Sequence, residues 1–252
     1  MDDPARCGIQ ARGVVCAAWS ELPALRKDPG SAELAPHIRM SDDQTVLATV
    51  AVWRAIVSAG WQEVRFADWG VIAAPRFLGR QRLANACVRY RKHNLRGYSP
   101  LIIPHQSLHA VAGTLSIALK IHGPNFGIGG GPDHVSESLL TGLGMVQRGM
   151  VPGLWLVVTD IDSEPVATDA GEVDTPTVGH ALALALMPND ANSLWTLELQ
   201  AQADRGDSEP LRVVELADVL QAAGMDSWCG AVAGIGRLTI QPAAALVSRL
   251  AA

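Results

Sequence analysis

The sequence predicts an α/β fold with a mixed, mostly parallel sheet covered by helices on both faces. Segments with the 3.6-residue periodicity of amphipathic helices alternate along the chain with short apolar runs that are typical of buried strands. The run 178–187 is apolar on both faces apart from Gly179 and His180, as expected for a central strand. No repeat, heptad pattern or linker divides the chain, so we expect residues 1–252 to form a single domain.

The first half of the chain contains two predicted helices and two predicted strands. In each helix the apolar residues recur at three- and four-residue spacing, and a glycine follows. Ser41 is the expected N-cap of the first helix. Each strand is a short apolar run bounded by turn residues. In order, the elements are a helix at 44–59, a strand at 69–74, a partly helical arginine-rich segment at 76–97, a helix at 107–120 and a strand at 126–128.

The second half repeats the alternation. The helix at 135–147 has Val135, Leu139 and Leu143 on one stripe and ends at Gly149. Apolar and polar residues alternate around Trp195, which predicts a half-exposed strand. The expected elements are the helix at 135–147, strands at 154–158, 178–187 and 195–199, and a last helix near 213–223.

Composition indicates a soluble globular protein. The chain is 48% hydrophobic and 18% charged, and it has no run of 18 apolar residues, which excludes disordered and membrane-spanning classes. The segment 1–4 is acidic and lacks the basic-then-apolar order of a secretory signal, so we expect a cytoplasmic protein with no membrane partner.

The cysteines are far apart and show no CxxC spacing. We therefore expect buried free thiols rather than a zinc site or a disulfide framework. The four cysteines are Cys7, Cys16, Cys87 and Cys229.

The net charge of −5 is unevenly distributed. Residues 69–132 contain no acidic side chain, whereas 16 of the 25 acids lie from Asp133 onward. A basic segment in an acidic chain indicates a selective acidic partner rather than bulk binding of nucleic acid. The alternative is a solvated surface segment without a partner. The basic residues are Arg76, Arg80, Arg82, Arg89, Arg91, Lys92 and Arg96.

A glycine-rich turn joins the strand at 126–128 to the helix at 135–147. At such a turn α/β proteins commonly place a nucleophile or bind an anion. The glycines and Pro132 can also be explained as turn chemistry alone, with Pro132 at the first helical position. Nucleotide binding is disfavoured because the turn lacks a P-loop lysine. The turn reads Gly129-Gly130-Gly131-Pro132-Asp133-His134, with no cysteine and with Ser136 as the first serine.

Ionisable side chains near the turn give a catalytic alternative. Asp133, His134 and Ser136 could in principle form an acyl-transfer group. The spacing weakens this interpretation, because residues i and i+2 of a helix point to different sides. Three more histidines flank the turn without a nearby carboxylate, so we expect neither a metal site nor a cofactor. These histidines are His105, His109 and His122.

Short motifs follow one another in a characteristic order between residues 110 and 160. They are Ala110-Val111-Ala112-Gly113, Gly123-Pro124, the strand at 126–128, the helix at 135–147, Gly149, and the strand that ends at Asp160. This order resembles the amino-terminal half of a β-ketoacyl synthase, a family within the thiolase superfamily. The helix at 44–59 and the runs "WGVIAA" and "VGHALALALMP" also fit, so the resemblance covers about residues 10–202.

The resemblance implies where the nucleophile of the family would lie. Ketosynthases use a cysteine at the start of this helix, where the helix dipole and backbone N–H groups favour the thiolate and the oxyanion, and two histidines from the second half of the fold assist. Counting without a gap from Gly123-Pro124 assigns the cysteine position to Pro132, which has no ionisable side chain and no N–H. The chain also ends near the length at which the second half would begin.

The resemblance therefore implies a non-catalytic, chain-length-factor-type subunit of a type II fatty-acid, polyketide or aryl-polyene pathway. Such a subunit pairs with a catalytic ketosynthase, or with a second copy, and shapes the acyl site. It implies docking of an acyl carrier protein on the seven basic residues above. It also implies a dimer contact at the edge strand Phe126, Gly127 and Ile128. Two alternatives stay open: an acyltransferase or thioester hydrolase that uses Asp133, His134 and Ser136, and a stand-alone module that binds an acyl group or a carrier protein.

Overall fold

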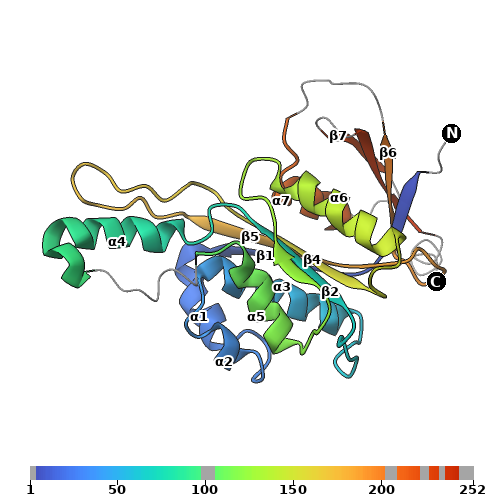
Figure 1. Cartoon of the computed structure of the whole chain (residues 1–252), viewed down its shortest axis with the longest axis horizontal. Coiled ribbons are helices and arrows are strands. Elements are labelled where there is room, and N and C mark those ends of the chain that lie inside the picture. Colours follow the sequence, from blue (N-terminus) through green and yellow to red (C-terminus); the bar gives the residue numbers. More distant parts are fainter. Residues whose placement is uncertain (1–3, 98–105, 202–208, 222–226, 233–235, 244–252) are drawn as a thin grey trace.

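The structure is a computed structural model, and it describes residues 4–97, 106–201, 209–221, 227–232 and 236–243. Within these residues eight strands form one sheet in the order β3-β2-β4-β5-β1-β6-β8-β7 (Figure 1). The strands are β1 (Ala5–Ala18), β2 (Gly70–Pro75), β3 (Asn125–Gly127), β4 (Leu154–Ile161), β5 (Val178–Met187), β6 (Trp195–Ala201), β7 (Trp228–Val232) and β8 (Gly236–Pro242).

Helices cover both faces of the sheet, as the sequence predicts. One core forms where α1, α2, α3 and α5 pack on the sheet, and the other where α6 and α7 pack on the opposite face (Figure 1). Inward side chains alternate along β4, so that Trp155 and Val157 enter the first core and Leu154 and Leu156 the second. These helices are α1 (Leu22–Lys27), α2 (Ala35–Ile38), α3 (Asp43–Ser58), α5 (His109–Ala118), α6 (His134–Gln147) and α7 (Val213–Gln221).

The sheet is mixed, but the expected parallel majority is wrong. Among the described strands only β2 pairs in parallel, with β3 and with β4, and the five other pairings are antiparallel. Two features explain the antiparallel pairs. A loop at 162–177 joins β4 directly to its neighbour β5, and β1 lies between β5 and β6 and is antiparallel to both. The sequence patterns did not predict β1.

Local expectations needed three corrections. The N-cap of α3 is Asp42, whose carboxylate accepts a hydrogen bond from the Gln44 N–H at 2.9 Å, and not Ser41. β6 is not half-exposed at Thr196 and Glu198, which are buried because β1 and β8 flank this strand and Arg6 pairs with Glu198. All four cysteines are free, but only Cys7 is buried, and Cys16, Cys87 and Cys229 are exposed.

The arginine-rich segment forms a helix, α4 (Arg80–His93), followed by a 3₁₀ turn (Asn94–Gly97). Figure 1 shows α4 projecting beyond the body of the fold together with the β4–β5 loop. A salt bridge of 3.2 Å between Arg80 and Glu164 joins the base of the helix to this loop. The helix and the loop therefore form one projecting arm.

Candidate functional site

The glycine turn lies at the carboxyl ends of β2 and β4. Ile128, which follows β3, donates its N–H to the carbonyl of Ala73 in β2 at 2.9 Å, and the chain then turns into α6. β4 lies on the other side of β2, parallel to it, so the carboxyl ends of the two strands meet at the turn. In open α/β sheets this is the position where ligands bind.

Backbone conformation explains two of the three glycines. Gly129 and Gly130 have φ values of +80° and +99°, which favour glycine, so the predicted turn chemistry is confirmed at these positions. A Cβ atom at Gly129 would lie 2.7 Å from the Cβ atom of His134, so the turn also requires glycine for space. Pro132 is exposed and precedes the helix, which begins at His134 after Asp133; it does not occupy the first helical position.

His134 is the most deeply buried ionisable group at the turn. Its side chain is 1% exposed, and neither ring nitrogen has a hydrogen-bond partner among the described residues. Burial lowers the pKa of His134 below its usual 6.5, although the nearby Asp160 carboxylate opposes the shift. The imidazole is therefore neutral at pH 7 and has unused hydrogen-bonding capacity.

Asp160 and Arg76 complete a polar cluster beside His134. Asp160 lies near the end of β4, is 5% exposed and accepts a hydrogen bond from the N–H of Ile161 at 2.9 Å. The Arg76 Nη1 atom lies 3.6 Å from Asp160 Oδ2 and balances its charge.

Gln44 at the start of α3 ties this cluster to the helix layer. Its Nε2 group donates to the Arg76 carbonyl at 2.7 Å, and its Oε1 atom accepts from the Thr159 hydroxyl at 2.7 Å. Neither Gln44 nor Thr159 was expected at a site from the sequence. A polar pair at the end of an apolar strand, Thr159 and Asp160, was the signal that could have found this cluster.

The structure does not assemble the predicted acyl-transfer group. Ser136 is buried, and Asp133 is half-buried and makes no side-chain cap hydrogen bond. Neither ring nitrogen of His134 forms a hydrogen bond with Ser136 or with Asp133. A nucleophile and its base need a hydrogen bond of about 2.6–3.2 Å. The arrangement therefore lacks the connection on which the catalytic alternative depends.

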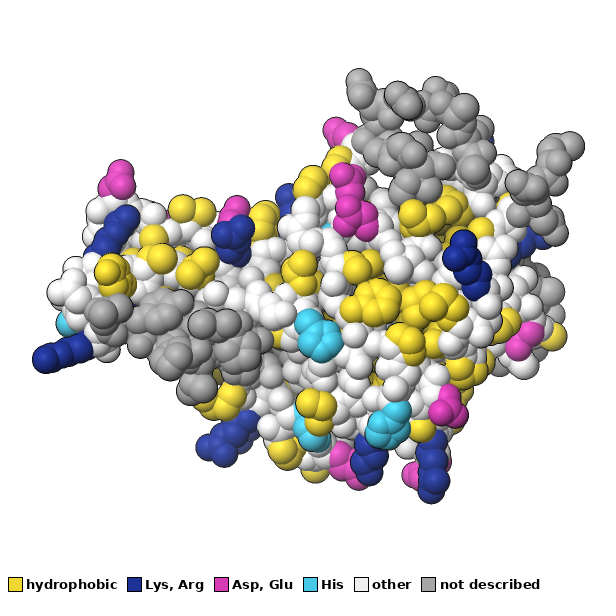
Figure 2. Space-filling view, in the orientation of Figure 1, with side chains coloured by type: hydrophobic (Ala, Val, Ile, Leu, Met, Phe, Trp, Pro, Cys, Tyr) yellow, Lys and Arg dark blue, Asp and Glu magenta, His cyan; other side chains and the backbone are white. Residues whose placement is uncertain are grey.

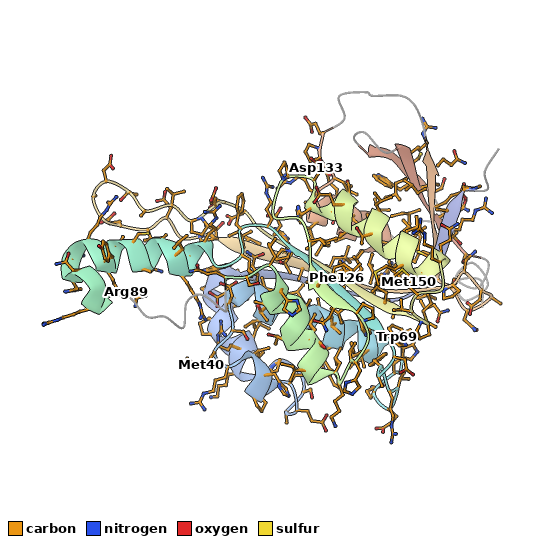
Figure 3. All side chains as sticks on the ribbon, in the orientation of Figure 1. Met40, Trp69, Arg89, Phe126, Asp133 and Met150 are labelled. Atoms are coloured by element: carbon orange, nitrogen blue, oxygen red, sulfur yellow. The ribbon has the colours of Figure 1, made fainter. Side chains whose placement is uncertain are left out.

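The seven predicted docking residues divide into two groups. Arg76 faces Asp160, Arg80 pairs with Glu164, and Arg82 donates to the carbonyls of Met40 and Ser41. The others are exposed, on the outer part of α4 and the turn after it, where Figure 3 labels Arg89. These four, Arg89, Arg91, Lys92 and Arg96, are called the arm cations below.

β3 forms one edge of the sheet and lies between α5 and α6. Phe126 and Ile128 are partly exposed there, and the dimer contact expected at this strand stays a prediction. Large exposed apolar side chains come from the flanking elements: Ile117 of α5 is 67% exposed, and Met150 after α6 is 59% exposed. Figure 2 shows hydrophobic side chains gathered on this face, and Figure 3 labels Phe126 and Met150. We call this surface the β3 edge surface.

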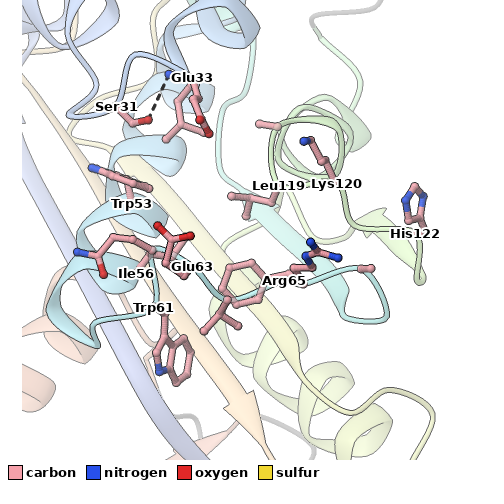
Figure 4. Close-up of a pocket in the computed structure, with 16 residues that line it drawn as sticks. Ser31, Glu33, Trp53, Ile56, Trp61, Glu63, Arg65, Leu119, Lys120 and His122 are labelled. Atoms are coloured by element: carbon pink, nitrogen blue, oxygen red, sulfur yellow. Dashed lines mark hydrogen bonds between the residues drawn. The ribbon is translucent and has the colours of Figure 1, made fainter.

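A separate groove of about 540 Å³ opens between α3, the 61–67 loop and the end of α5 (Figure 4). Trp53 and Trp61 line it, together with charged side chains of both signs such as Glu63 and Lys120. Among the described residues, its lining includes none of the predicted catalytic, docking or edge residues, and of the described flanking histidines it includes His122 but not His109.

Two further expectations concern metals and membranes. His109 and His122 are exposed, and His105 lies outside the described residues. In the described part of the chain no three His, Cys, Asp or Glu side chains gather as a metal site would require. None of the described helices is both long and apolar enough to cross a bilayer.

Comparison with known families adds independent information. The family model described as "Beta-ketoacyl synthase, N-terminal domain" matches residues 23–130, from α1 to the glycine turn. No curated protein sequence matches the chain.

Solved structures with the same fold are ketosynthases and their complexes. A chain of the ketosynthase ApeO in complex with its chain length factor ApeC, from Xenorhabdus doucetiae, superposes with a TM-score of 0.58 at 15% identity, covering 94% of this chain and 99% of that one. A chain of AntDE:AntF, a type II PKS acyl-carrier protein in complex with its ketosynthase, gives 0.58 at 12% identity, with 80% and 70% covered. A β-ketoacyl synthase from Burkholderia phymatum gives 0.54 at 14% identity, with 81% and 66% covered. At these identities the similarity defines the fold, and the expected ketosynthase-like fold is confirmed.

Proposed function

We propose that this β-ketoacyl synthase-like chain is a non-catalytic, chain-length-factor-type subunit that pairs with a catalytic ketosynthase in a type II pathway. The observation that carries the proposal is the residue at the turn. The strand, glycine turn and buried helix start are present, yet the position assigned to the nucleophile is Pro132. A proline side chain cannot form a thioester, and proline has no N–H with which to stabilise an oxyanion.

The surrounding cluster supports the absence of catalysis by this chain. The nearest hydroxyl nucleophile, Ser136, is buried and is not hydrogen-bonded to His134. The imidazole of His134 is neutral and has no hydrogen-bond partner among the described residues, and Asp160 faces Arg76. An imidazole activates a nucleophile only when the two are hydrogen-bonded. These contacts therefore support the proposal that the turn retains the conformation of the family's active-site turn but has no catalytic group.

The β3 edge surface supports pairing with another chain. An edge strand presents unpaired backbone groups that can pair with another strand, and exposed apolar side chains around it favour burial in an interface. Ile117 and Met150 supply that apolar surface on the two sides of β3. We infer that a ketosynthase chain covers this surface, with a second copy of this chain as the competing occupant.

The arm cations support docking of an acyl carrier protein. Such carriers are acidic and bear a phosphopantetheine phosphate, and arginine binds carboxylate and phosphate groups through paired N–H donors. The arm cations are exposed, whereas Arg76, Arg80 and Arg82 are occupied within the chain. The docking proposal is therefore narrowed from seven residues to four.

Co-expression tests the proposal. The chain is produced alone and together with a catalytic ketosynthase encoded in the same genome. Sedimentation measures whether a complex forms, and condensation of acyl-carrier substrates measures its activity. We expect a 1:1 complex, no condensation by this chain alone, and a change in product length when the complex forms. Condensation by the chain alone would contradict the non-catalytic role, and failure to associate with the ketosynthase at micromolar concentration would contradict the pairing.

The two alternatives predict different results in the same experiment. An acyltransferase or hydrolase would turn over an acyl thioester alone and lose this activity in His134→Ala. A stand-alone binding module would retain an acyl group or a carrier without any ketosynthase, which mass spectrometry of the purified chain would detect.

A further inference from the structure

A notch opens in the sheet where β6 separates from β1. The two strands pair from Ala5 to Ile9, and Trp195 at the start of β6 lies opposite Ile9. A β-bulge follows between Ile9 and Ala11. Beyond it, no described strand pairs with this side of β1. Bulges redirect side chains and end pairing, and they are frequent beside functional sites.

Side chains of α3, instead of a strand, complete the open edge of β1. Ser58 donates its hydroxyl to the Arg12 carbonyl at 3.4 Å, and Arg54 donates Nη1 to the Val14 carbonyl at 2.8 Å. The resulting cavity is about 540 Å³, within the usual range for a small-molecule site. It lies on another part of the sheet from the glycine turn and contains no residue of the site described above. Its lining residues are Gln10, Ala11, Arg12, Ser58, Ala59, Trp61, Asn192, Leu194 and Trp195.

Arg12 is the one charged residue in this lining. Its guanidinium carbon lies 5.8 Å from the centroid of the Trp195 ring, and its Nη1 atom is buried without a hydrogen-bond partner among the described residues. No carboxylate of the described residues lies within salt-bridge distance of it. Burial lowers the pKa of Arg12 below its usual value, which reflects the desolvated cation. A partly buried guanidinium without a counter-charge is costly, and an anion would relieve that cost.

Asp190, the acid that contacts the lining residues Gln10 and Asn192, is already engaged. Asp190 Oδ1 accepts from the Gln10 Nε2 group at 3.0 Å and from the Asn192 N–H at 2.8 Å, and its side chain is not part of the lining. Its hydrogen bonds position Gln10 and Asn192 at the rim of the notch. The Gln10 and Asn192 side chains and the Ser58 hydroxyl are neutral polar groups, so the lining offers one positive charge and additional hydrogen bonds.

The polar groups of the lining favour one class of anion over another. A single planar guanidinium with neutral neighbours matches a monoanionic carboxylate, which accepts two parallel N–H bonds, better than a phosphate dianion, for which more cations are usual. The apolar part of the lining does not select an aromatic group, because Trp195 is 2% exposed in the core under α6 and α7, whereas Trp61 packs against the core under α3 on the opposite face of the sheet. Trp61 also belongs to a cluster of aromatic rings with Phe66, Trp69 and Trp155, which fixes its position.

We propose that the notch between β1, the end of α3 and the β5–β6 loop is a binding site for a small monoanionic carboxylate, held by Arg12 through its planar N–H donors. The inference is independent of the pairing and docking proposed above, because it uses none of their residues.

Titration of the intact chain with benzoate tests this site. Binding is measured by isothermal calorimetry and by the change in tryptophan fluorescence, with cyclohexanecarboxylate and inorganic phosphate as comparison ligands. We expect saturable binding of benzoate and at least tenfold weaker binding of phosphate. Arg12→Gln should weaken benzoate binding at least tenfold. Arg39→Gln removes the same charge at an exposed position outside the lining and should change the affinity less than twofold.

Arg12→Lys serves as a second variant, because it keeps the positive charge while removing the planar fork. It should weaken benzoate binding at least threefold. If circular dichroism shows that Arg12→Gln does not fold, Arg12→Lys tests whether Arg12 binds the carboxylate. Absence of saturable benzoate binding to the unmodified chain would overturn the proposal. Equal losses in the Arg12 and Arg39 variants, or phosphate binding as tight as benzoate binding, would also overturn it.

Discussion

The hydroxyl of Thr159 donates a 2.7 Å hydrogen bond to the Oε1 atom of Gln44, although the two residues are 115 positions apart and both are buried. The other end of the Gln44 amide donates to the Arg76 carbonyl. One side chain at the start of α3 thus connects the carboxyl ends of β2 and β4, between which the polar cluster of the candidate site forms. Buried polar contacts of this kind fix the position of a helix more specifically than apolar packing does.

Replacing Gln44 by alanine should destabilise the fold. The substitution leaves the Thr159 hydroxyl and the Arg76 carbonyl without their partner in a buried place, and each unsatisfied group costs about 1–3 kcal/mol. We expect a loss of about 2–4 kcal/mol in urea unfolding, against less than 0.5 kcal/mol for Gln62→Ala on the exposed 61–67 loop. A loss no larger than that of Gln62→Ala would show that the buried bridge contributes little.

Asp42 should make stability depend on pH. Burial raises the pKa of Asp42 from 3.8 to about 6, with Asp43 adding to the shift and the Gln44 N–H, Arg82 and Arg26 opposing it. The folded state binds the Asp42 proton more tightly than the unfolded state does. Protonation of Asp42 therefore stabilises the fold fully below pH 3.8, and this stabilisation is lost as the pH rises through 6. Asparagine keeps the cap without ionising.

Asp42→Asn should therefore match the unmodified protein near pH 4 and exceed its stability by about 1–3 kcal/mol at pH 8. Chemical unfolding at both pH values measures the difference, and Asp68→Asn, at an exposed position, is the control. A difference that does not change between pH 4 and pH 8 would contradict the burial effect.

Sequence patterns predicted the elements whose buried face can be identified from residues close together in the sequence. The periodicity at 44–59 and at 135–147 corresponds to α3 and α6, because a helix on a sheet buries one stripe of its own residues. β1 was missed because its bulge interrupts the alternation: Cys7 and Ile9 enter the core under α6 and α7, whereas Ala11 enters the core under α3.

The polar cluster was harder to predict because it depends on strand order. The sequence places Arg76, His134 and Asp160 after three different elements, and only the adjacency of β2 and β4 brings them together. The docking segment was equally hard to predict, because composition reveals its charges but not their partners. Asp160, Glu164 and the carbonyls of residues 40 and 41 occupy three of its arginines.

Gly129→Ala should destabilise the glycine turn more than the matched change Gly60→Ala. Both residues have positive φ, at +80° and +70°, so alanine is strained at each by about 1 kcal/mol. Only at Gly129 would the new Cβ meet another atom, His134 Cβ at 2.7 Å, whereas nothing lies within 4 Å at Gly60. We expect an additional loss of about 1–3 kcal/mol for Gly129→Ala in urea unfolding, because the N-terminus of α6 must shift. Equal losses would mean that the turn relaxes freely.

Charge reversal on α4 should weaken carrier binding. In Arg89→Glu/Arg91→Glu two exposed cations become repulsive to an acidic carrier, so we expect at least tenfold weaker binding and a smaller dependence on salt concentration. The control Arg39→Glu/Arg148→Glu makes the same change of net charge at exposed positions outside the arm. Similar weakening in both double variants would indicate an effect of net charge and would remove the support for a docking site on α4.

Phe126→Arg should disrupt the pairing proposed for the β3 edge surface. The residue lies on the edge strand and is half-buried against the core under α6 and α7, so the new charge would lie at the border between that core and the surface that a partner would desolvate. Burying an unpaired charge in an interface costs several kcal/mol, and we expect the complex with the ketosynthase to weaken at least a hundredfold in sedimentation experiments. Val64→Arg introduces the same side chain at an exposed apolar position on the 61–67 loop and should leave the complex intact. Thermal unfolding of the isolated Phe126→Arg chain separates loss of pairing from loss of folding. A folded Phe126→Arg chain that still binds the ketosynthase as tightly as the unmodified chain would place the interface on another surface.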